Sequence, residues 1–341
     1  MGIVRSFRIK VSVALATLSL SSLNCASMGP APGAALPPGA LLATIPVGTG
    51  PTCLAMAPDG SQLYAASNSS FRVIETAGNT VKATLPIGPN PTGIAVTPDG
   101  SQVLITHLFS VSMTVFDTTT NALGKPITLL AQRFTGGFGR IAVVPDGSVA
   151  WVANQANEII AVVRLDGSDV SARQVDMRPV DIAFTPDGSA AYVAGCRQQC
   201  VPGTVEVIST TQELTQRYIN VGPSPYRIAM APNGARFYTT NLADSSLSMI
   251  DASSGSTIAT VPIGVEPTGL AVARDGSVVY ATSQDLGTVT AIDTTTNTAR
   301  PTLRVGNQAR DVVLSPDGKR LYVSTGDAVV VVASQAFSGG S

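Results

Sequence analysis

The residues best suited to chemistry in this chain are arginines and aspartates that recur beside short apolar runs. Seven such runs, of the type IAVVP, repeat along the sequence. The position just before each run holds Cys53, Gly93, Arg140, Asp181, Arg227, Gly269 and Asp311, and Arg178, Tyr226 and Arg310 flank it. Guanidinium groups bind carboxylates and phosphates through paired hydrogen bonds. If the runs converge, three arginines and two aspartates meet there. They either bind an anion or a partner, or pair with one another as a structural plug.

The chain has a single histidine, His107, in the sequence THLFSV. An imidazole can act as a general base or as an axial ligand. No Ser, Cys or carboxylate motif accompanies it, and G-x-S-x-G, Walker and zinc signatures are absent. We therefore predict no catalytic residue beyond this one candidate, and no metal or cofactor.

Cys196 and Cys200 are separated by three residues. In an exported protein this spacing favours a disulfide that pins a loop, although a redox pair stays open. A metal site would need further thiolates or imidazoles, and haem attachment would need C-x-x-C-H. Cys53 has no evident partner and is predicted to be a small buried apolar residue.

The N-terminus has the order of an export signal. Arg5, Arg8 and Lys10 precede the apolar stretch 11–23, which is shorter than the ~20 residues that span a bilayer. This order is typical of a secretory signal peptide, here residues 1–25. We expect a periplasmic, cell-envelope or extracellular protein.

Cys25 follows the apolar stretch directly, as a lipidated cysteine would. A lipobox prefers Gly, Ala or Ser before the cysteine and Leu three residues before it, whereas Asn24 and Ser22 stand there. Lipidation and simple cleavage both stay open. Residues 26–40 are rich in Pro, Gly and Ala, which predicts a semi-rigid linker.

The elements that must position the charged residues are set by a repeat. Asp-Gly or Asn-Gly turns begin at residues 58, 98, 145, 186, 232, 274 and 316, at spacings of 40, 47, 41, 46, 42 and 42. Each unit holds an apolar run, the turn, a strand such as RLYVST, an alternating strand such as SLSMIDAS and an outer strand such as ATVPIG. This period suits a propeller blade of four strands, so the chain is predicted to be all-β.

The repeat resembles the YVTN-repeat β-propeller family, which includes YncE-like proteins. The matching words are RLYVST from Arg320, SMIDASSGSTIATVPIG from Ser248 and TAIDTTTN from Thr290, and the resemblance covers about residues 41–333. It implies a seven-bladed β-propeller with four antiparallel strands per blade. Such a fold hosts many functions, so the resemblance fixes fold better than activity.

The two ends of the repeat predict how the ring closes. Residues 41–48 match an outer strand, and residues 329–334 match a third strand. The N-terminal strand should therefore complete the last blade, within a propeller of residues 41–334. This closure protects a sheet edge. Residues 335–341 are predicted to be a flexible tail.

One face of the ring should carry the Asp-Gly turns and the other the longer loops, where function usually lies. Two insertions explain the long spacings. AQRFTGGFG is expected to bring Arg133 and Phe138 to the loop face, and AGCRQQCVPG carries the cysteine pair. These residues join the candidate ligand-binding set.

A formal net charge of −1 gives no basic excess for nucleic acid. We therefore predict an exported, non-enzymatic propeller that binds a protein, peptide or anionic ligand at its loop face and channel mouth. Two alternatives are a lactonase-like hydrolase that uses His107 and a support subunit for an electron-transfer or cofactor enzyme. Nucleic acid is not an expected partner, and membrane contact is expected only through a lipid on Cys25.

Overall fold

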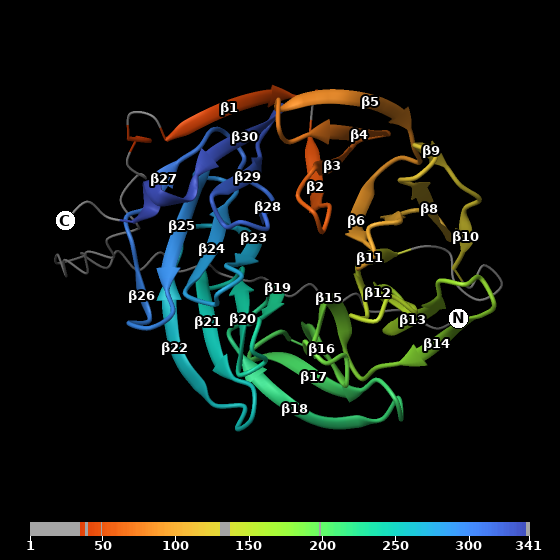
Figure 1. Ribbon diagram of the computed structural model, residues 1–341. Coiled ribbons are helices and arrows are strands. Elements are labelled where there is room, and N and C mark those ends of the chain that lie inside the picture. The colour runs from red at the N-terminus through yellow and green to blue at the C-terminus, as the bar shows by residue number, and fades with distance from the viewer. Residues whose placement is uncertain (1–34, 38–39, 49, 130–136, 198, 339–341) are drawn as a thin grey trace, which may run out of the picture.

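The computed structural model describes residues 35–37, 40–48, 50–129, 137–197 and 199–338. Within these ranges the strands form seven antiparallel sheets that stand around a ring (Figure 1). The all-β, seven-bladed prediction is confirmed. The described residues include no helix that is long and apolar enough to span a membrane.

The first four blades follow the order of the sequence. Blade 1 comprises β2 (Pro51–Met56), β3 (Gln62–Ser67), β4 (Ser70–Glu75) and β5 (Thr80–Pro86). Blade 2 comprises β6 (Pro91–Val96), β7 (Gln102–His107), β8 (Ser112–Asp117), β9 (Ala122–Leu123) and β10 (Ile127–Thr128). Blade 3 comprises β11 (Phe138–Val143), β12 (Val149–Asn154), β13 (Ile159–Arg164) and β14 (Val170–Gln174). Blade 4 comprises β15 (Arg178–Phe184), β16 (Ala190–Cys196), β17 (Gly203–Ser209) and β18 (Thr215–Val221).

The last three blades complete the ring. Blade 5 comprises β19 (Pro225–Met230), β20 (Arg236–Asn241), β21 (Ser246–Asp251) and β22 (Thr257–Pro262). Blade 6 comprises β23 (Pro267–Val272), β24 (Val278–Ser283), β25 (Thr288–Asp293), β26 (Thr298–Ala299) and β27 (Leu303–Arg304). Blade 7 comprises β28 (Val312–Leu314), β29 (Arg320–Ser324), β30 (Ala328–Ala333) and β1 (Leu41–Pro46).

The outer strands of blades 2 and 6 are each split into two short pieces. Pro126 lies between β9 and β10, and Pro301 lies between β26 and β27. Proline has no backbone N–H and cannot donate to a β-ladder. The split is therefore a local consequence of the sequence.

The core is divided among the gaps between blades. Seven apolar clusters each join two neighbouring blades. In the gap between blades 4 and 5, Tyr192 packs on Phe237 with ring centroids 5.0 Å apart. Because both faces of the middle strands are covered, β16 and β17 are buried along their whole length, whereas outer strands such as β22 alternate.

The N-terminal strand closes the ring as predicted. β1 pairs antiparallel with β30, with Thr44 opposite Val330, and the two strands lie side by side in Figure 1. The prediction of a loose tail from residue 335 is wrong for its first residues. Ser334–Phe337 forms a 3₁₀ helix, and Phe337 is buried with its ring 5.5 Å from that of Tyr280. An aromatic side chain that finds an apolar gap docks its segment.

The Asp-Gly turns pack on one another around one face, here called the turn face. The Asp59 carboxylate accepts hydrogen bonds from the N–H and hydroxyl of Ser61. Gly60 has a φ of +73°, and a Cβ there would lie 2.7 Å from the ring of Pro316 in the next turn. Glycine and proline recur in these turns because each turn seats against its neighbour.

Candidate binding site at the channel mouth

The inner strands bring the predicted charges together in the central channel. Arg227 lies between two carboxylates: Nη2 is 3.0 Å from Oδ1 of Asp311, and Nη1 is 3.7 Å from Oδ2 of Asp181. Arg140 Nη1 is 3.8 Å from Oδ2 of Asp311. These four side chains, here called the inner network, come from blades 3, 4, 5 and 7.

Both aspartates of the inner network also bind backbone across blade boundaries. Asp311 accepts from the N–H of Leu54 in blade 1 at 3.0 Å. Asp181 accepts from the N–H of Ile228 in blade 5 at 3.0 Å. Asp311 is 1% exposed, and a buried charge is stable only when paired and hydrogen-bonded. The inner network therefore joins neighbouring blades around the central channel.

Arg140 is positively charged within the inner network. Burial lowers its pKa, but attraction to anionic groups around it, among them the Asp311 carboxylate, outweighs burial, and the net shift is upward. Burial raises the pKa of the Cys53 thiol, which is buried and unpaired, with Sγ 3.8 Å from Arg140 Nη1. Cys53 is thus a neutral thiol packed beside a guanidinium, as its apolar sequence context predicted.

Above the inner network lies a cavity of about 310 Å³, here called the mouth cavity. Each blade lines it with the residue just before the inner-network position: Thr52, Thr92, Gly139, Val180, Tyr226, Thr268 and Arg310. Arg140 reaches it from below, with its Cζ 6.0 Å from the ring centre of Tyr226. The mouth cavity is therefore built by the whole ring.

Arg310 differs from the arginines of the inner network. Its Nη2 donates to Gln308 Oε1 at 3.2 Å and makes no ion pair within the described ranges, although its Nε is buried without a hydrogen-bond partner, as is the Nε of Arg227. No carboxylate of the described residues lies within ion-pair distance of Arg310. Three arginines against two aspartates leave a net charge of +1, carried by Arg310 at the cavity.

Three threonines at the mouth hold the blades together. The hydroxyl of Thr92 donates to the carbonyl of Phe138 at 2.8 Å, and that of Thr268 donates to the carbonyl of Arg310 at 2.9 Å. Thr52 reaches Pro91 in the same way at 3.2 Å. These contacts explain the Pro-Thr-Gly words of blades 2 and 6, and sequence reasoning missed them.

Two other predicted residues, Phe138 and Arg178, do not line the mouth cavity. Phe138 is 0% exposed in the core between blades 2 and 3, so its predicted display at the loop face is wrong. It begins β11 opposite Asn154, and the pairing turns its ring inward. Arg178 lies beside the cysteine loop, with Nη2 3.9 Å from Cys200 Sγ. Arg133 and Cys25 lie outside the described residues.

The predicted disulfide between Cys196 and Cys200 is present. It closes the start of the β16–β17 connection on the loop face. Beside it, the Arg197 guanidinium lies over the Tyr218 ring at 4.2 Å and within 3.6 Å of Asp176. The bridge therefore fixes a loop that displays a cation and an aromatic ring.

His107 is held as a structural residue. It is 2% exposed, with Nδ1 3.3 Å from the carbonyl of Pro89 and Nε2 2.9 Å from the hydroxyl of Thr114. A carbonyl only accepts, so Nδ1 carries the proton and Nε2 accepts from Thr114. Burial lowers the pKa of the ring. Neither nitrogen is left for a substrate, and His107 does not line the mouth cavity.

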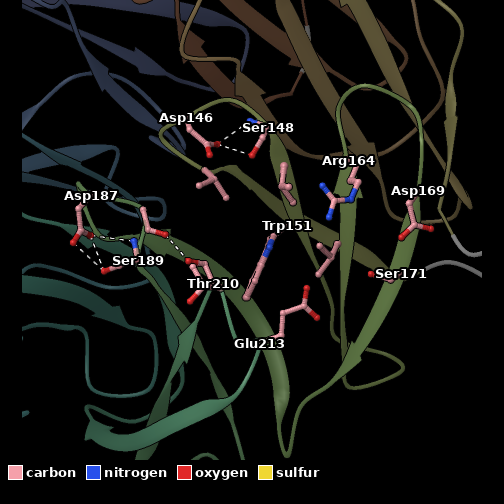
Figure 2. Close-up of a pocket in the computed structure, with 15 residues that line it drawn as sticks. Asp146, Ser148, Trp151, Arg164, Asp169, Ser171, Asp187, Ser189, Thr210 and Glu213 are labelled. Carbon is pink, nitrogen blue, oxygen red and sulfur yellow. Dashed lines mark hydrogen bonds between the residues drawn. The ribbon is translucent and has the colours of Figure 1, made fainter.

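Sequence reasoning placed function on the loop face and missed a second pocket, which lies on the turn face. This pocket lies between blades 3 and 4 around Trp151 and has a volume of about 410 Å³ (Figure 2). The one available signal was that the chain's single Trp stands where most blades have Tyr. Across the described ranges, no group of three or more His, Cys, Asp and Glu side chains could hold a metal ion.

Comparison with known proteins shows the fold and no family. No family model matches the chain, and no curated protein matches it. A solved structure, Kuenenia stuttgartiensis hydrazine synthase, matches with a TM-score of 0.75 at 19% identity, over 84% of this chain and 96% of that one. The chain is therefore a seven-bladed β-propeller, and this likeness shows the fold alone.

Proposed function

We propose that this protein is an exported, non-enzymatic propeller of the YVTN-repeat type that binds an anionic group at its mouth cavity. The ligand is a carboxylate or phosphate carried by a small molecule, a peptide or an envelope protein. The observation that carries the proposal is Arg310, a cation at the rim of a cavity lined by all seven blades, with no carboxylate partner among the residues that the structure describes.

The surrounding geometry suits this role. Arg310 supplies the guanidinium, and Tyr226, two blades away in blade 5, lines the same cavity with an aromatic side chain. Arg140 adds positive potential from below, although its charge is largely balanced by Asp311. The hydrogen bonds from Thr92 and Thr268 to carbonyls of the next blade keep the cavity rigid, which lowers the entropy cost of binding.

The hydrolase alternative has lost its candidate base, because both His107 nitrogens are engaged. The support-subunit alternative has no residue in its favour, since the similarity to hydrazine synthase is one of fold. The N-terminal signal pattern supports export. The repeated sequence motifs support membership of the YVTN-repeat family.

The test is calorimetric titration of residues 28–341 with succinate, citrate, inorganic phosphate and peptides with a free C-terminus, together with capture from an envelope extract. Arg310→Ala should bind at least tenfold more weakly than the wild type. Arg274→Ala removes the same charge from an exposed turn-face position and should bind normally. Equal loss in both variants, or no anion bound and no protein captured, would contradict the proposal.

A further inference from the structure

The gap between blades 3 and 4 holds the pocket of Figure 2 on the turn face. Trp151 of β12 stands at its centre. Asp146 and Asp187, from the Asp-Gly turns of the two blades, lie on one side of the ring. Arg164 and Asp169 lie on the other side. Thr210 and Glu213, from the turn between β17 and β18, complete the wall.

Two of the other gaps on the turn face are closed by arginines. Arg236 of blade 5 donates from Nη1 to the carbonyl of Thr294 in blade 6 at 2.8 Å. Arg320 of blade 7 donates in the same way to the carbonyl of Thr76 in blade 1 at 3.0 Å. Each guanidinium reaches the carbonyl that directly follows the third strand of the next blade. In both gaps the backbone carbonyl after the third strand therefore accepts a hydrogen bond from a guanidinium.

A second position serves the gap between blades 4 and 5. Arg217 of β18 donates from Nη2 to the carbonyl of Ala252, again the residue after the third strand. Tyr192 of β16 donates its hydroxyl to the same carbonyl at 3.2 Å. Two arginine positions and one aromatic position of a blade can therefore bind this acceptor.

Blade 3 lacks an arginine at both of these positions. Arg236 and Arg320 pair with the last residues of the third strands of their blades, β21 and β30. Val149 pairs with the last residue of β13, so it occupies the equivalent position in blade 3. Ser171 stands where blade 4 has Arg217. The acceptor here is the Thr210 carbonyl, and no arginine in the described part of the chain donates to it. The pocket is the space that a guanidinium fills elsewhere.

The pocket also offers a donor and negative charge. Trp151 is 2% exposed, and its indole N–H has no hydrogen-bond partner in the described part of the chain, although the side chain lines the pocket. Four carboxylates, those of Asp146, Asp169, Asp187 and Glu213, against the single guanidinium of Arg164 leave a net charge of −3. The indole nitrogen is not fully buried, so it can donate from the pocket wall to an acceptor that comes from outside.

We propose that this pocket binds an arginine side chain from a peptide segment of a partner protein. The guanidinium donates to the Thr210 carbonyl and faces the carboxylates, as Arg236 and Arg320 do in their own gaps. A main-chain carbonyl of the same peptide accepts from the Trp151 indole. The proposal concerns the face opposite the mouth cavity and does not depend on anion binding there.

The test uses the fact that Trp151 is the chain's only tryptophan, so its fluorescence reports this pocket alone. The purified protein is titrated with N-acetyl-arginine N-methylamide, and the matched probe is the uncharged citrulline analogue. We expect a saturable change in emission with the arginine probe, at least tenfold weaker half-saturation with citrulline, and weakening by salt. A wild-type response that does not saturate, or that is equal for the two probes, would overturn the proposal.

Two variants sharpen the result. Val149→Arg places the missing arginine on the chain itself and should abolish the response while circular dichroism stays unchanged. Asp169→Asn combined with Glu213→Gln alters only exposed carboxylates and should weaken half-saturation at least threefold. If Val149→Arg does not fold, the double variant decides the matter. Probe binding that is unchanged in a folded variant of either kind would show that the pocket is only a gap between blades.

Discussion

The channel centre and the pocket between blades 3 and 4 are both rich in charge, but they use it differently. In the inner network, Arg227 bridges Asp181 and Asp311, and the aspartates also bind backbone of the next blade. In the pocket on the turn face, carboxylates outnumber cations, and the arginine found in comparable gaps is missing. Charges that satisfy one another hold the ring together, whereas charges left over are candidates for recognition.

The largest test of this comparison is Asp311→Ala. The change leaves Arg140 and Arg227 buried beside a missing partner and removes the acceptor of the Leu54 N–H. Breaking a buried ion pair costs about 3–5 kcal/mol, so the free energy of unfolding should fall by about that amount in urea titration. Asp169→Ala, at an exposed carboxylate of the pocket, is the control. Similar stability of the two variants would mean that the inner network does not hold neighbouring blades together.

Gly269→Ala tests how tightly the blades meet at the mouth. A Cβ there would lie 2.6 Å from the Thr282 hydroxyl and 2.8 Å from the carbonyl of Arg310. Overpacking of this kind costs about 1–3 kcal/mol, and thermal unfolding should show it. At Gly139 the nearest atom to a Cβ is 3.6 Å away, so Gly139→Ala should keep wild-type stability. An equal loss of stability in the two variants would mean that the blades do not meet more closely at Gly269 than at Gly139.

Acid should weaken the turn face in small steps. Hydrogen bonds from Thr185 and Ser189 lower the pKa of Asp187 to about 2, and bonds from Ser253 and Ser254 do the same for Asp251. An unfolded Asp titrates near ~3.9. These groups therefore stabilise the fold above about pH 4, and the contribution is lost as the pH falls through about 2. The Ser189→Ala variant should show a smaller decline of melting temperature over this range, and an unchanged decline would exclude Asp187 as a source.

The smallest effect on stability is expected at Arg310. Its side chain has no carboxylate partner in the described part of the chain, so Arg310→Ala should change the free energy of unfolding by only about 0.5 kcal/mol or less. Urea titration beside the binding assay gives both numbers. A loss of stability comparable to that of Asp311→Ala would mean that Arg310 belongs to the inner network, and it would remove the basis of the proposed anion site.

The repeat pattern alone is enough to predict the blades and their closure. Asp-Gly turns at a period near 42 residues, apolar inner runs and an outer strand at residues 41–48 are local patterns, and each blade obeys them with its own residues. The same alignment placed Arg140, Asp181, Arg227 and Asp311 at one level of the ring. The cysteine spacing also predicted the bridge that the structure contains.

Which of these charges pair with one another, and which are left unpaired, depends on how the folded blades meet. Arg227 and Asp311 are 84 residues apart, and Leu54 and Asp311 are 257 apart. The inward turn of Phe138, the docking of Phe337 and the open gap beside Val149 likewise depend on the neighbouring blade. A sequence repeat predicts the strands and turns of each blade. Contacts between blades depend on individual side chains that are not repeated from one blade to the next.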